Sequence, residues 1–209
     1  MPSLAVYPIR ALKRMLKVQF LSFKEMPECL VISPGGCGSN TLVLYLDKYI
    51  KSNIYFEKKY KFFGLSHIYK PNFFLKKNKT KIILINRNFE DIYNSLMSRG
   101  FIRNSLNLLG DLFPFVYINI FKNNKYLKQK FYKYLELFYS NWSDYDKKYI
   151  LNIEYEYLYK NKKAAILIKK FLDIKNPEFT KNFPKYKKYN KKKNFVDPSS
   201  ILSRKIYNL

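Results

Sequence analysis

Residues 28–42 read E-C-L-V-I-S-P-G-G-C-G-S-N-T-L, and this stretch decides the fold. The apolar run 28–33 is typical of a buried parallel strand, which ends at the Pro-Gly-Gly turn. Apolar residues then recur at helical spacing and predict a helix over residues 39–51. A glycine-rich turn between a strand and a helix favours phosphate binding, because backbone N–H groups at the helix start point at the anion.

A second strand-to-helix junction lies further along the chain. Residues 81–86 read K-I-I-L-I-N, which is the strongest strand pattern in the sequence, and residues 89–97 follow as a predicted helix. Arg87 stands at the end of this strand, and Ser95 lies inside the helix. An arginine fork can bind a phosphate through two hydrogen bonds, and a serine hydroxyl can donate another. The two junctions together predict an enzyme that holds a nucleotide with two separate phosphate groups.

Strand and helix patterns alternate over the rest of the chain. Residues 65–71 and 149–153 are interpreted as strands, and residues 126–142 and 164–172 as helices. The alternation indicates an α/β fold, a three-layer sandwich with a mostly parallel central sheet of the P-loop NTPase-like kind. Ligands of such folds bind at the carboxyl ends of the strands, so both junctions are expected to face one crevice.

Three segments are distinguished along the chain. Residues 1–27 form a lysine-bearing N-terminal lead-in with a helical pattern, residues 28–180 form the α/β domain, and residues 181–209 form a lysine-rich tail. The apolar residues at 101–124 show no clear periodicity, and residues 98–125 are expected to shape the pocket of the acceptor. No internal repeat is found.

The 209 residues carry a formal net charge of +25, but this charge is a weak guide to function. Only six of the 40 basic residues are arginine, and lysine, asparagine, isoleucine and tyrosine are the residues that an AT-rich genome encodes by default. We therefore expect no nucleic-acid partner, although the positive field would steer an anionic ligand inward. No apolar run approaches the roughly 20 residues of a membrane span. No secretory signal is evident, and a cytoplasmic location is expected.

Metal and disulfide chemistry are not expected from this sequence. The two cysteines, Cys29 and Cys37, lie on a predicted strand and in the adjoining loop, without metal-ligand spacing. His67 is the sole histidine. A two-cysteine chain cannot build a disulfide framework, and one histidine cannot build a multi-histidine metal site.

The two junctions resemble the motifs of the nucleotide-dependent sulfotransferases. That family carries a P-K-S-G-T-T turn near its start and, after a later strand, R-N-P-x-D-x-x-x-S. Here the corresponding segments read P-G-G-C-G-S-N-T and R-N-F-E-D-I-Y-N-S, and I-L-N-I-E-Y-E-Y-L at residues 150–158 is similar to the family's later strand and Y-E-x-L segment. The resemblance covers roughly residues 28–175 and is most specific in the arginine motif.

The resemblance implies a cofactor, a reaction and a set of site residues. The sulfuryl donor would be 3′-phosphoadenosine 5′-phosphosulfate, and the acceptor would be a hydroxyl or amine of a small molecule or glycan. Arg87 and Ser95 would hold the 3′-phosphate, His67 would be the catalytic base, and Glu57 and Glu90 remain alternatives to it. The 5′-phosphosulfate would be held by Gly35, Gly36, Cys37, Gly38, Ser39, Asn40 and Thr41.

The sequence also departs from the family pattern. The loop lysine is absent, so another cation, Lys70 or a lysine of the tail, would have to neutralise the bridging oxygen. Phe89 stands where the motif has proline, and no R-K-G segment is evident near the end of the chain. Two alternatives stay open: a P-loop nucleotide kinase or NTPase, disfavoured by the missing Gly-Lys-Ser/Thr, and a non-catalytic nucleotide- or polyanion-binding protein on the same fold.

Overall fold

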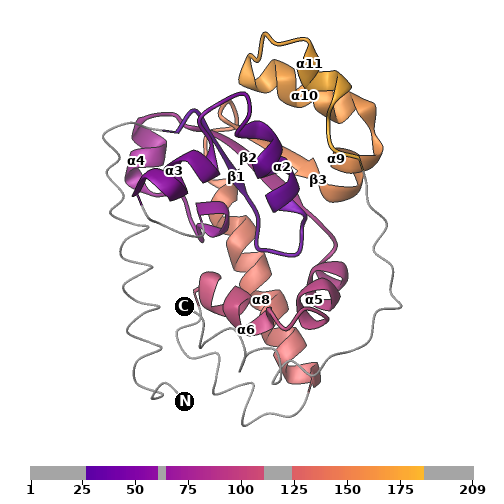
Figure 1. Cartoon of the computed structure of the whole chain (residues 1–209). Helices are drawn as coiled ribbons and strands as arrows, with labels where there is room; N and C mark the ends of the chain where they lie inside the picture. The colour runs from indigo at the N-terminus through magenta and orange to yellow at the C-terminus, as the bar shows by residue number, and fades with distance from the viewer. Residues whose placement is uncertain (1–26, 61–64, 111–123, 186–209) are drawn as a thin grey trace.

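The computed structural model describes residues 27–60, 65–110 and 124–185 (Figure 1). Three parallel strands form its sheet, in the order β1 (Cys29–Ile32), β2 (Lys81–Asn86) and β3 (Ile150–Glu154). Cys29 pairs with Lys81, and Ile82 pairs with Ile150. The α/β class and the parallel sheet are therefore confirmed for the described part of the chain.

Helices pack on both faces of the sheet, with α2 and α9–α11 toward one side and α8 toward the other (Figure 1). Their bounds are α2 Ser39–Leu46, α3 Asn53–Tyr60, η1 Leu65–His67 (a 3₁₀ turn), α4 Phe73–Lys77, α5 Phe89–Met97, α6 Ile102–Leu108, α8 Asn124–Ser143, α9 Tyr155–Lys160, α10 Lys162–Leu172 and α11 Glu178–Lys181. None of these described helices has the length and apolar character of a membrane span.

Helix α8 supplies the largest apolar stripe of the core. Phe131, Leu135, Phe138 and Trp142 recur at three- and four-residue spacing and are all fully buried. The Trp142 indole nitrogen donates to the Ile68 carbonyl over 3.1 Å, so its one polar atom is satisfied inside the core. The aromatic pattern that predicted helix 126–142 is therefore a packing pattern.

The outer edge of β1 is closed by a side chain, and this corrects one sequence prediction. Residues 65–71 were predicted as a strand, but the prediction was wrong: they begin with the 3₁₀ turn η1. The buried Asn53 amide accepts from Val31 N over 2.9 Å and donates to Val31 O over 3.0 Å, as a neighbouring strand would. It also donates to Ser66 Oγ over 3.1 Å, while Ser66 O accepts from Ser33 N over 2.8 Å. The edge is thus satisfied without a strand.

The predicted helix 39–51 is shorter than its apolar pattern suggested. It ends at Leu46, with Asp47 as its C-cap. The Asp47 carboxylate accepts from Tyr55 N over 3.0 Å in the first turn of α3. The Asp47 side chain thus bonds the next helix, α3. Ile50, in the connection between the two helices, packs against the core.

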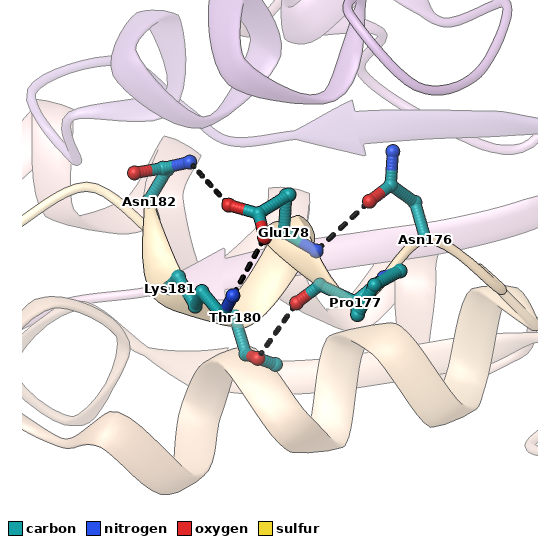
Figure 2. Close-up of polar contacts among 6 residues, drawn as sticks. All are labelled: Asn176, Pro177, Glu178, Thr180, Lys181 and Asn182. Atoms are coloured by element: carbon teal, nitrogen blue, oxygen red, sulfur yellow. Dashed lines mark hydrogen bonds and ion pairs between the residues drawn. The ribbon is translucent and has the colours of Figure 1, made fainter.

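The described chain continues in ordered contacts beyond α10, where no element was predicted. Helix α11 is one short turn, and Figure 2 shows its local polar contacts. Asn176 Oδ1 accepts from Glu178 N over 2.8 Å, and the Glu178 carboxylate pairs with Lys181 over 2.7 Å. This turn buries Phe179 against Tyr45 of α2 and against Tyr49 in the turn that follows α2. The expectations for residues 1–26 and for the tail after residue 185 lie outside the described residues.

Candidate functional site

The glycine loop, residues 34–38, connects β1 to α2 through left-handed backbone. Gly35, Gly36 and Gly38 have φ angles of 96°, 71° and 66°, which glycine adopts without a steric penalty. A Cβ on Gly36 would lie 3.2 Å from the Ile92 carbonyl oxygen, and one on Gly38 would lie 2.8 Å from Tyr155 Cε2. The glycines are therefore required both for the backbone conformation and for close packing against α5 and α9.

Arg87 joins the second junction to the glycine loop. Its Nη1 donates to the Gly36 carbonyl over 2.6 Å, and its guanidinium lies over the Tyr155 ring, 4.4 Å from the centroid. Its Nε is 3.9 Å from Glu156 Oε1, and the side chain is only 17% exposed. The two junctions that the sequence singled out therefore meet, and the Tyr155-Glu156 segment meets them at the same point.

Two side-chain donors fix the direction of the loop peptides. Arg87 holds the Gly36 carbonyl, and the Tyr159 hydroxyl donates to the Gly38 carbonyl over 2.7 Å. In a trans peptide the C=O and the following N–H point in opposite directions. The N–H groups of Cys37 and Ser39 therefore point away from these two side chains. These N–H groups lie at the start of α2, where the first backbone N–H groups of a helix and its dipole favour an anion.

His67 lies beside the loop, in η1. Its Nδ1 is 2.8 Å from the Ser33 carbonyl oxygen. Because a carbonyl oxygen only accepts, Nδ1 carries the hydrogen and Nε2 carries the lone pair of the neutral ring. A Cβ on Gly35 would lie 3.9 Å from His67 Cε1, which places the imidazole against the loop. This is the tautomer that a general base acting through Nε2 requires.

Ser95 does not meet Arg87 in the part of the chain that the structure describes. The Ser95 hydroxyl instead accepts from Arg99 Nη2 over 3.1 Å, and Arg99 Nε donates to the Ser95 carbonyl over 2.8 Å. Arg87 contacts Gly36, Tyr155 and Glu156. The two residues thus have different partners in the described structure, and their binding of one phosphate stays a prediction.

The remaining predicted loop residues fall into two groups. Asn40 and Thr41 are exposed in the first turn of α2. Cys37 and Ser39 are buried, and the Ser39 hydroxyl accepts from Ser33 Oγ over 3.0 Å. Burial raises the pKa of the Cys37 thiol to about 12, although the charge of Arg87 opposes this shift. Cys37 is therefore a neutral packing residue.

The two alternative bases are engaged elsewhere. Glu57 Oε1 accepts from Leu65 N over 2.7 Å, which ties the end of α3 to η1. Glu90 pairs with Lys128 and Tyr132 of α8, and these hydrogen bonds lower the pKa of its carboxyl. A carboxylate with a lowered pKa is a poorer base, so His67 is the better candidate. Lys70, the expected substitute cation, is exposed.

A cavity of about 290 Å³ adjoins Arg87 between the carboxyl end of the sheet and α8. Its polar lining includes Asn86, Ser143 and Asn152, and Phe89 and Tyr139 stack beside it with an interplanar angle of 11°. The buried Asn86 Oδ1 and Arg87 Nε have no hydrogen-bond partner among the described residues. Within these same residues, no group of three or more acidic, cysteine or histidine side chains is arranged to hold a metal ion.

Sequence reasoning missed two side chains that contact the glycine loop, Tyr155 and Tyr159, and it missed Arg99 as the partner of Ser95. The I-E-Y-E-Y-L segment drew attention to residues 150–158, but no local pattern indicates that Tyr155 and Tyr159, one helical turn apart, pack over Gly38. Comparison of the chain with protein-family models, with curated proteins and with solved structures finds no match.

Proposed function

We propose that this chain is a sulfotransferase that uses 3′-phosphoadenosine 5′-phosphosulfate, on a P-loop-like three-layer α/β fold. One observation carries the proposal: the Arg87 guanidinium contacts the glycine loop at Gly36 and stacks on Tyr155. Three segments that resemble family motifs, far apart in the sequence, thereby lie around one candidate anion site. This convergence is independent of the sequence resemblance that suggested the family.

The proposed reaction is an in-line transfer. The acceptor oxygen attacks the sulfur, the bond between sulfur and the bridging phosphate oxygen breaks, and 3′,5′-adenosine bisphosphate leaves with the bond's electron pair. The acceptor proton passes to His67 Nε2. Loop N–H groups at the start of α2 stabilise negative charge that grows on the transferring group and the leaving phosphate, and the charge of Arg87 acts on them from the other side of the loop. An amine acceptor would follow the same course.

The Ser33 contact supports this role for His67. Its Nδ1–H donates to the Ser33 carbonyl, next to the glycine loop, so imidazole orientation and loop position are linked. General-base catalysis by a positioned side chain typically contributes about 10²–10⁴-fold to a rate. The His67→Ala variant is expected to lose about that factor in turnover while it keeps its affinity for the donor.

The test is release of 3′,5′-adenosine bisphosphate from the donor in the presence of a panel of hydroxyl and amine acceptors, compared for wild type and His67→Ala. Acceptor-dependent release that falls at least a hundredfold in the variant supports the proposal. Magnesium-dependent ATP turnover instead would favour the kinase or NTPase alternative. Nucleotide binding without any transfer would favour the non-catalytic binding protein, which the missing loop lysine already favours slightly.

A further inference from the structure

The amino end of the parallel sheet, opposite the glycine loop, carries a group of lysines. Strand β2 begins at Lys81 and β3 at Ile150, and the segments that precede them are residues 73–79 and 144–149. Residues 73–79 contain three lysines and no acidic residue, and residues 144–149 contain two lysines and two aspartates. Five lysines are therefore set against two acidic residues at this end of the sheet.

Contacts between the two segments bring these lysines onto one surface. The Tyr145 hydroxyl donates to the Leu75 carbonyl over 2.9 Å, which ties the end of α8 to α4. The ammonium groups of Lys79 and Lys148 both lie over the Tyr149 ring, 5.9 and 5.6 Å from its centroid. One aromatic ring thus holds a lysine of each segment.

The charge of these lysines is not neutralised within the described residues. All five are exposed, and none forms an ion pair there: Lys76, Lys77, Lys79, Lys147 and Lys148. The Asp146 carboxylate accepts from the backbone N–H of Lys148 over 2.9 Å, and Asp173 at the end of α10 pairs with Lys175. The surface therefore keeps a positive field that attracts an anionic partner.

A large aromatic side chain is exposed beside the lysines. Phe73, the first residue of α4, is 68% exposed, and the Lys77 ammonium lies 5.9 Å from its ring centroid. The position of Phe73 is fixed by its neighbours, because the Asn72 side chain caps α4 at Leu75 N over 2.8 Å and Leu75 is buried. Positive charge and exposed apolar area therefore occur together.

We infer that this end of the sheet docks on a membrane surface that contains anionic lipids, through a basic face. The basic face consists of Phe73, Lys76, Lys77, Lys79, Lys147 and Lys148. Lysines are attracted to anionic headgroups, and an aromatic ring that enters the boundary between headgroups and acyl chains leaves water. A nucleic-acid duplex would attract the same lysines but has no apolar layer for Phe73, so the exposed ring favours the lipid surface.

Docking by the basic face is independent of the proposed transfer reaction. The glycine loop and Arg87 follow the carboxyl ends of β1 and β2, whereas the basic face precedes the amino ends of β2 and β3. A membrane bound at the amino end leaves the candidate site at the other end of the sheet. Loss of either activity can therefore be observed without loss of the other.

The test is co-sedimentation of the full chain with vesicles of phosphatidylcholine alone and with vesicles that also contain phosphatidylserine. Wild type is expected to bind only the anionic vesicles, and less strongly as the salt concentration rises. Each lysine near an anionic surface contributes about fivefold to the partition coefficient, so Lys76→Glu/Lys77→Glu should weaken binding by about 25-fold or more. Phe73→Ser should weaken it by about tenfold, because less apolar area leaves water.

The matched control is Lys162→Glu/Lys163→Glu, which makes the same charge change at exposed positions in the first turn of α10. It should keep the wild-type partition coefficient within about twofold. An equal loss in the two double variants would overturn the inference, because binding would then follow total charge. Unchanged binding of Phe73→Ser would overturn it too, as would a wild type that binds duplex DNA but no vesicles.

Discussion

Replacement of Asn53 by alanine is expected to be among the most destabilising single changes in the described part of this protein. The Asn53 amide is fully buried and makes two hydrogen bonds to the backbone of Val31, at 2.9 and 3.0 Å. Alanine would leave the Val31 N–H and C=O unsatisfied in a fully buried strand. Each unsatisfied group costs about 1–3 kcal/mol, so the free energy of unfolding should fall by about 2–6 kcal/mol.

That loss is a large part of the roughly 5–15 kcal/mol that stabilises a typical domain. Urea denaturation followed by far-UV circular dichroism gives the free energy of unfolding and the slope m together. Asn53→Asp is a second variant, because its carboxylate can still accept from Val31 N but faces the Val31 carbonyl without a hydrogen to donate. It should be destabilised at least as strongly as the alanine variant.

Asn94→Ala is the matched control. This asparagine is exposed on α5, where its amide donates to Glu90 Oε1 over 3.2 Å. Exposed substitutions of this kind usually change stability by no more than about 0.5 kcal/mol. A loss below about 1 kcal/mol for Asn53→Ala, with m unchanged, would refute the claim that this side chain replaces a missing edge strand.

Three further predictions concern the glycine loop. Gly38→Ala should destabilise the protein by about 1–2 kcal/mol through its φ of 66°, and more through the 2.8 Å approach to Tyr155. Gly110→Ala is also strained, at a φ of 104°, but its Cβ meets only ordinary contacts with Tyr69, so thermal denaturation of the two variants compares the cost of the close approach. Tyr159→Phe should lower stability by about 0.5–1.5 kcal/mol by removing the hydroxyl bond to Gly38; a melting temperature equal to wild type would argue against that bond's importance. Burial raises the pKa of the Cys37 thiol to about 12, so Cys37 should resist iodoacetamide at pH 8 until urea unfolds the chain. Rapid labelling of Cys37 in the native protein would contradict its burial.

The parts of the fold that the sequence predicted well are those specified by local signals. Strand β2 has four consecutive buried residues, 82–85, and its observed bounds match the predicted run. Helix α5 begins where Asn88 caps Glu90 N and carries acidic residues in its first turn, and it also matches. Local hydrophobicity and capping fixed these elements.

The parts that could not be predicted depend on contacts between distant residues. The outer edge of β1 is completed by Asn53, 22 positions after Val31 in the sequence, and no periodic pattern marks that asparagine. The contact of Tyr159 with Gly38 spans 121 positions. Arg87 and the loop were correctly suspected of sharing one edge of the sheet, because the carboxyl ends of parallel strands meet there. Arg99, the partner of Ser95, was missed. A basic side chain just after a helix commonly bonds the last carbonyls of that helix, so its presence in the sequence gave no specific signal.

The central claim is that the glycine loop and Arg87 together bind a nucleotide that carries two phosphate groups. The most direct measurement is the shift in melting temperature of the wild-type protein and of Arg87→Ala with 3′,5′-adenosine bisphosphate, against ATP and 5′-AMP. A ligand that binds only the folded state raises the apparent melting temperature. The account predicts a selective rise with the bisphosphate in wild type that Arg87→Ala abolishes. No rise, or an equal rise with ATP, would contradict it.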